Sequence, residues 1–95
     1  MKYKLKFLPK ALKEWNSLDN SLKEQFKEKL QKIKDNPIIQ ANALRNMPNC
    51  YKVKLRNSGY RLVYEVEEEI ITVYVILIGK RDKLSVYKKA SQRLT

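Results

Sequence analysis

Alternating apolar and polar residues predict two neighbouring strands in the middle of the chain. Their apolar positions are Tyr51, Val53 and Leu55 in the first run and Tyr60, Leu62, Tyr64 and Val66 in the second. Asn57-Ser58-Gly59 between the runs is typical of a hairpin turn. Because a half-exposed sheet buries its apolar face, the hairpin should place Lys52 and Lys54 on the open face, with Lys54 opposite Arg61. Like charges directly opposite one another are destabilising, so this face indicates a polyanionic ligand.

The first third of the chain predicts a strand followed by two helices. Residues 2–7 alternate lysines with apolar residues, as a strand with one wet face does. Pro9 suits the first turn of a short helix that ends near Ser17. A second helix follows, N-capped by Asp19, Asn20 or Ser21 and stopped at Asn36-Pro37. Its apolar stripe is Leu22, Phe26, Leu30 and Ile33. Only a few residues join the helices, so we expect an antiparallel helical hairpin.

The rest of the chain completes an α+β domain. A helical turn is expected at 41–44, and Glu67–Glu69 marks a turn into the apolar run from Ile70 to Ile78. That run is rich in β-branched residues and predicts a strand buried on both faces. Residues 83–94 predict a weakly amphipathic C-terminal helix. The order is β-α-α-β-β-β-α, with helices against one face of a mostly antiparallel sheet; the pattern leaves open which strand pairs with residues 2–7.

Length and charge narrow the class of protein. The 95 residues suit a single domain, 1–95, and carry 21 Lys and Arg against 10 Asp and Glu, a net charge of +11. That excess points to nucleic acid, an anionic membrane surface or an acidic protein partner. The single cysteine, Cys50, excludes a disulfide framework and fits a reducing cytosol. No apolar run approaches the ~18 residues of a membrane span, so we expect a cytoplasmic protein.

The absence of histidine excludes much of the chemistry of enzymes. Without it there is no His acid–base pair, no Ser-His-Asp triad, no Cys-His dyad and hardly any zinc site. No Gly-rich phosphate loop is present either, so we expect no metal and no cofactor. Lysine, arginine and tyrosine remain, and they can cleave RNA because its own 2′-OH attacks the adjacent phosphorus. A lysine crowded by other cations has a lowered pKa and can serve as the base; Lys54 lies in such a crowd.

Three segments of the chain resemble RelE toxins of bacterial and archaeal toxin–antitoxin pairs. They are A-L-K-E-W from Ala11, the run from Ala41 to Tyr64, and I-G-K-R-D with Val86-Tyr87. The resemblance extends over essentially the whole chain. It implies a microbial-RNase-like fold and a metal-independent mRNA endonuclease acting in the ribosomal A site (30S). It also implies neutralisation by a RelB-type antitoxin, which a strongly basic toxin suits if that partner is acidic.

The resemblance also implies roles for individual residues. Lys52 and Lys54 would lie at the scissile phosphate, with Lys54 as the base. Arg61 would stabilise the phosphorane, Arg81 would support the leaving oxygen and Tyr87 would stack on or orient the nucleotide. Arg45, in the matching stretch, would add phosphate or RNA contacts. Apart from the resemblance, we expect RNA contacts from two basic neighbours of these residues, Arg56, which is not a site residue of the family, and Lys80.

Two alternatives remain at the level of sequence. A toxin of the ParE type has the same fold and poisons gyrase, but should lack the set of basic residues and tyrosine. A non-enzymatic basic module could bind RNA through charge alone. A membrane-surface role has least support, because neither of the first two helices combines a strongly basic face with large interfacial aromatics.

Overall fold

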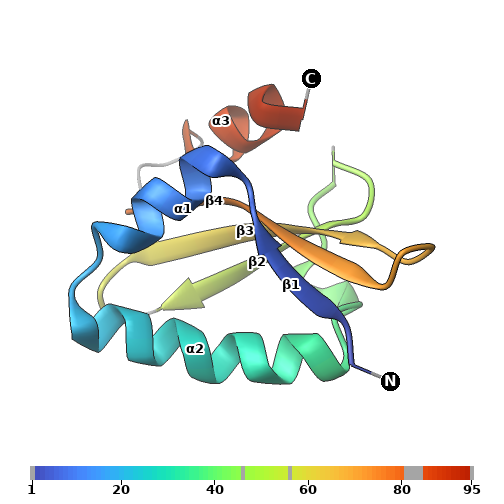
Figure 1. Cartoon of the computed structure of the whole chain (residues 1–95). Helices are drawn as coiled ribbons and strands as arrows, with labels where there is room; N and C mark the ends of the chain where they lie inside the picture. The colour runs from blue at the N-terminus through green and yellow to red at the C-terminus, as the bar shows by residue number, and fades with distance from the viewer. Residues whose placement is uncertain (1, 46, 56, 81–84, 95) are drawn as a thin grey trace.

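A computed structural model describes residues 2–45, 47–55, 57–80 and 85–94, with the side chains of 85–87 outside this description. The strands are β1 (Lys4–Phe7), β2 (Cys50–Leu55), β3 (Tyr60–Glu67) and β4 (Thr72–Lys80). The helices are α1 (Pro9–Asn16), α2 (Asn20–Asp35) and α3 (Ser85–Leu94), with a 3-10 turn, η1 (Gln40–Asn42), between α2 and β2 (Figure 1). The α+β class and the order β-α-α-β-β-β-α are confirmed.

The four strands form one sheet in the order β1-β4-β3-β2. β1 lies parallel to β4, which settles the partner that the sequence left open, and the other two pairs are antiparallel. Lys54 pairs with Arg61, so the register expected from burial of the apolar face is confirmed. Gly59 closes that hairpin with φ 76, a backbone angle that glycine adopts without steric cost.

Helices α1 and α2 cover one face of the sheet and enclose the larger core. The predicted apolar stripe of α2 is buried along its whole length: Leu22, Phe26, Leu30 and Ile33. Asp19 is the N-cap, since its carboxylate accepts the Leu22 N–H at 2.9 Å. The Tyr64 hydroxyl, also buried in this core, donates to the carbonyl of Pro37 just beyond the helix. The structure thus selects Asp19 among the three candidate N-caps, and α2 ends at Asp35, directly before the predicted stop at Asn36-Pro37.

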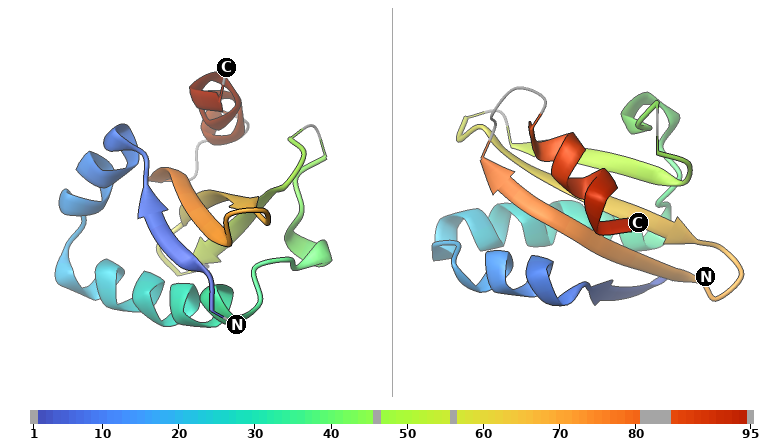
Figure 2. Two further views of the ribbon diagram at one scale, coloured as in Figure 1. Left: turned by 45° about the vertical axis from the view of Figure 1, so that its right-hand side comes forward. Right: turned by 90° about the horizontal axis from the view of Figure 1, so that it is seen from above.

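Helix α3 lies against the opposite face, so the expectation that all helices cover one face is wrong (Figure 2). Ala90 of α3 is fully buried in a smaller cluster. Its other members are Met47, which precedes β2, and the strand residues Cys50, Val63, Ile76 and Leu77. Because β4 is apolar on both sides, each face of the sheet requires a cover. The short C-terminal helix supplies the second one.

The turn between β3 and β4 is longer than the sequence indicated. Ile70 and Ile71 were expected in a buried strand, but β4 begins at Thr72 and the Ile70 side chain is 55% exposed. The chain needs these residues to reverse direction: Ile71 adopts φ 49 and its N–H donates to the carbonyl of Glu68 at 3.2 Å. Apolar character alone does not separate the end of a turn from the start of a strand.

Candidate nucleic-acid interface

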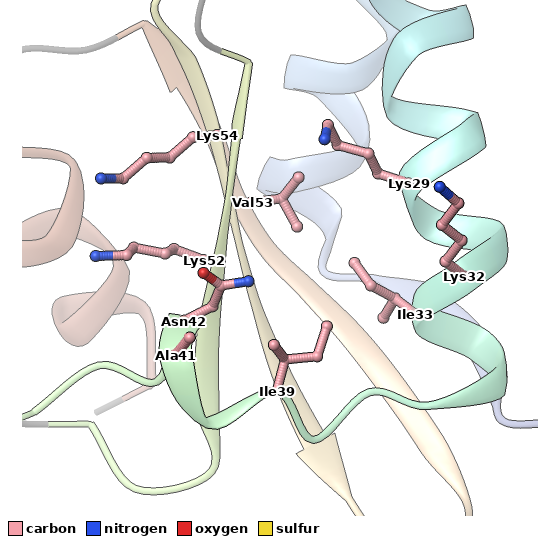
Figure 3. A pocket seen from close by; sticks show the side chains of 9 residues that line it. All are labelled: Lys29, Lys32, Ile33, Ile39, Ala41, Asn42, Lys52, Val53 and Lys54. Carbon is pink, nitrogen blue, oxygen red and sulfur yellow. The ribbon is translucent and has the colours of Figure 1, made fainter.

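Cations gather on the α3 side of the sheet, near its β2 edge. Lys54 on β2 pairs with Arg61 on β3, which in turn pairs with Gly79 on β4, so the three positions form one row across the sheet. Lys52 begins the next row, opposite Val63. Figure 3 shows the Lys52 and Lys54 side chains extending from the same side of β2, toward α3, while Val53 points the opposite way, toward α2. We call Lys52, Lys54 and Arg61 the cationic face.

The cationic face is accessible to a ligand. Lys54 is exposed, and Lys52 and Arg61 are half-buried. Gly79 completes the row of Lys54 and Arg61 without adding a side chain, so β4 contributes no bulk beside the arginine. Glycine within a strand often marks the close approach of a ligand or another backbone. Placing two cations directly opposite one another costs stability, and an anionic ligand would offset that cost.

Two further lysines approach β2 from α2, and the sequence reasoning missed them. Lys29 and Lys32 line a groove of about 420 Å³ together with Lys52 and Lys54. Figure 3 shows them on the wall opposite β2, with apolar side chains between the walls. The apolar part of this lining is Ile33, Ile39, Ala41 and Val53. The spacing of the two lysines beside buried Ile33 could have indicated a cationic rim on α2.

The remaining predicted site residues are more dispersed. Arg45 is exposed and follows Leu44, whose N–H donates to the Cys50 carbonyl at 3.0 Å, so it lies near the start of β2. Lys80 ends β4 opposite Tyr60, and strand alternation puts it on the face away from Arg61. The structure therefore does not join Arg45 or Lys80 to the cationic face.

Three predicted residues lie outside this geometry. Arg56 and Arg81 are outside the described residues. Tyr87 belongs to α3, but its side chain lies outside the described part of the chain. The roles suggested for these residues stay predictions.

In the described part of the chain, neither a metal-binding cluster nor a membrane-spanning helix is found beside the cationic face. Among the described residues no group of three or more His, Cys, Asp and Glu side chains could hold a metal ion. In the same part of the chain, no helix has the length and apolar character needed to cross a membrane. Cys50 is buried in the edge strand β2. Burial is the main cause that raises the pKa of its thiol to about 12, and the negative charges of Glu65 and Glu67 add to this shift. A buried thiol of this kind is inert and serves as a packing group.

Comparison with known proteins identifies the protein family of this chain. A family model described as "ParE toxin of type II toxin-antitoxin system, parDE" matches residues 5–84. Since that range is most of the chain, the chain belongs to the ParE/RelE family of toxins of type II toxin–antitoxin systems.

Within this family, the similar proteins include RelE toxins. The mRNA interferase toxin RelE of Escherichia coli K12 is 51% identical over 94 residues, covering 99% of either chain. A mutant of E. coli RelE in the free state has a TM-score of 0.91 at 49% identity, with 100% of both chains covered. RelE in the intact E. coli RelBE toxin–antitoxin complex has a TM-score of 0.83 at 52% identity, covering 85% of this chain and 99% of that one.

Proposed function

We propose that this chain is an endoribonuclease toxin, an mRNA interferase that cuts mRNA in the A site of the ribosome. The observation that carries the proposal is the cationic face, where Lys54 and Arg61 stand opposite one another with Lys52 in the adjacent row. The E. coli relative that matches nearly the full chain is named an mRNA interferase. Both support a site built to bind and cleave a polyanion.

The proposed reaction is an intramolecular transesterification of RNA. The 2′-oxygen loses its proton and forms a bond to the adjacent phosphorus, and the bond from phosphorus to the 5′-oxygen breaks as that oxygen gains a proton. The products are a 2′,3′-cyclic phosphate and a free 5′-hydroxyl. Because the nucleophile belongs to the substrate, the enzyme mainly has to align it and stabilise the charge that develops.

The cationic face supplies groups for these tasks. Lys54 takes the 2′-OH proton, and Lys52 neutralises the scissile phosphate. Arg61 donates hydrogen bonds to the phosphorane oxygens, since guanidinium N–H groups match that geometry. Arg81 would stabilise the leaving 5′-oxygen, and Tyr87 would stack on or orient the nucleotide. Both residues follow the pattern of the RelE family.

Further basic residues would hold the RNA at some distance from the reaction. Arg45, Arg56 and Lys80 would contact phosphates along the strand or in the ribosome. Such contacts fix the position of the RNA without reading its sequence. Because the described contacts join neither Arg45 nor Lys80 to the cationic face, we assign them to binding rather than to the chemical step.

The proposed protein partner is a RelB-type antitoxin. E. coli RelE, about half identical to this chain, has been solved in complex with its antitoxin. A chain with a net charge of +11 favours an acidic partner, since opposite charges accelerate association and select the partner. A protein that acts on translating ribosomes would work in the cytoplasm.

The ParE description of the family model keeps a gyrase poison as the second candidate. The nuclease is favoured because the cationic face is present and because the E. coli relative at 51% identity is an mRNA interferase. A basic module that only binds RNA would bind ribosomes and leave the mRNA intact.

The experiment is primer-extension mapping of an mRNA incubated with the protein, with and without programmed ribosomes. Pretreating the toxin with a chelator, which is then removed, tests the expected independence from metal. We expect cuts within the A-site codon that require ribosomes and disappear when the antitoxin is added. Intact mRNA in the presence of folded protein would contradict the proposal, and inhibition of DNA supercoiling by gyrase would then support the second candidate.

A further inference from the structure

The first and last helices of the chain are joined by a forked ion pair. Arg93 of α3 contacts both carboxylate oxygens of Glu14 on α1, with Nη1 to Oε1 at 2.8 Å and Nη2 to Oε2 at 3.0 Å. The Arg93 and Glu14 side chains are only 17% and 32% exposed. Two parallel hydrogen bonds between a guanidinium and a carboxylate fix the geometry of both groups. This pair is therefore more than a loose surface contact.

The same two side chains also bind the backbone of β4. Arg93 Nη1 donates to the Ile76 carbonyl at 2.8 Å, and Glu14 Oε1 accepts the Ile78 N–H at 3.1 Å. Here we call the Glu14–Arg93 pair with its two backbone partners the clasp.

The clasp lies where the sheet loses a strand. β1 ends at Phe7, opposite Val75, and the Leu8 N–H makes the next bond, to the Val75 carbonyl. β4 continues to Lys80, so beyond Val75 no strand among the described residues lies beside this edge. A register shift between Val63 and Tyr64 leaves Ile76 as the extra residue of a bulge in β4. Polar groups on such an edge need partners, and the clasp supplies them from two side chains in place of a strand.

The clasp also fixes one end of α3. Among the described side chains of this helix, Ala90 alone is fully buried, and the others except Arg93 are exposed. A buried methyl group makes no directional bond, so it constrains the angle and register of a helix less than hydrogen bonds do. Arg93, in the last turn of α3, adds directional bonds to α1 and to β4. Arg93 and Glu14 thus contribute directional bonds that hold α3 over the sheet.

We propose that Glu14 and Arg93 are positioning residues for RNA cleavage: the clasp holds α3 beside the cationic face and so fixes where residue 87 lies. The inference rests on the proposed function, because it treats Tyr87 as part of the site. Lys52 and Lys54 extend from β2 toward the side of the sheet that α3 covers (Figure 3). A helix released from the clasp would leave these lysines in place but lose its alignment with them.

The test compares Glu14→Gln and Arg93→Gln with matched controls that remove the same charge from exposed positions, Glu28→Gln and Lys89→Gln. Cleavage is measured at saturating and limiting concentrations of programmed ribosomes. We expect the clasp variants to lose about 10- to 100-fold in the saturated rate, the size of effect that follows from a misplacement of about 1 Å. The half-saturating ribosome concentration should change less than about twofold, and both controls should behave as wild type.

Two further readouts separate positioning from general stability. Hydrogen exchange should accelerate at the α3 amides of both clasp variants and stay unchanged in α2. In combination with Tyr87→Ala, Arg93→Gln should cause little additional loss, since both changes act through the same helix. Exchange is measured without ribosomes, so it tests the clasp even if the wild type fails to cleave mRNA.

Three results would overturn the inference. The first is a saturated cleavage rate of the clasp variants equal to that of the controls. The second is unchanged hydrogen exchange in α3. The third is a double variant, Arg93→Gln with Tyr87→Ala, whose loss of rate equals the product of the two single losses. If Arg93→Gln does not fold, Arg93→Lys keeps the charge without the fork and should show the same losses in part. Failure of both to fold would make the clasp a requirement of folding and contradict a positioning role.

Discussion

At the scale of single residues, Cys50 shows how burial in the sheet affects the ionisation of a thiol. It begins β2 and is 1% exposed in the smaller cluster beneath α3. Burial is the main cause that raises the pKa of its thiol to about 12, and the carboxylates of Glu65 and Glu67 add to it. The folded protein therefore keeps a neutral thiol at pH values where the unfolded chain has a thiolate.

This difference predicts a loss of stability in alkali. Below about pH 9 the thiol is protonated in both states, and as the pH rises toward 12 only the unfolded state ionises, which favours unfolding. The free energy of unfolding should fall by up to about 1.4 kcal/mol per pH unit in this window through Cys50. Urea unfolding at a series of pH values measures the slope. Cys50→Ala should reduce it, and an equal slope in wild type and variant would contradict the assignment.

At the scale of elements, α2 depends on its N-cap. Asp19 accepts the Leu22 N–H and satisfies one of the amides that have no partner within the helix. Asp19→Ala should lower the free energy of unfolding by about 1 kcal/mol. Asp35→Ala, at the other end of the same helix, is the control and should cost clearly less. Equal losses at the two positions, measured by urea unfolding, would mean that the cap contributes nothing specific.

The elements whose patterns are local could be predicted from the sequence. The stripe from Leu22 to Ile33 and the pairing of Lys54 with Arg61 depend only on side-chain periodicity and on one buried face. Consequently, the core of the cationic face was predictable once the hairpin register was known. The resemblance of the sequence to RelE toxins then suggested the function of the cationic face.

Arrangements that depend on distant contacts could not be predicted in this way. The parallel pairing of β1 with β4 and the docking of α3 on the opposite face follow from which apolar surfaces remain uncovered after the rest has folded. The clasp joins residues 79 positions apart. Lys29 and Lys32 belong to the groove only because α2 lies next to β2.

At the scale of the whole molecule, part of the positive charge is concentrated in the cationic face. The net charge of +11 belongs to the whole chain, and Lys52, Lys54 and Arg61 place three of its positive charges on one side of the sheet. Binding to RNA should therefore weaken steeply with salt, because each neutralised phosphate releases counterions. Lys52→Gln should lower the slope of log K against log salt by about 0.7 for a single-stranded RNA.

That slope can be measured by fluorescence anisotropy with a 2′-O-methyl RNA, which cannot be cleaved because its nucleophile is blocked. Lys10→Gln is the matched control, since Lys10 is exposed on α1, which covers the other face of the sheet. Equal reductions of the slope in the two variants would show that total charge, rather than the cationic face, determines binding.

The central claim is that Lys54 takes part in the chemical step and does not merely attract RNA. Lys54→Arg tests it most directly, because arginine keeps the positive charge but does not give up its proton. We expect the variant to bind programmed ribosomes as wild type does and to cut A-site mRNA at least about 100-fold more slowly, with Lys10→Arg as an active control. Cleavage by Lys54→Arg at the wild-type rate would contradict the account, and so would a loss of binding that fully accounts for the loss of cleavage.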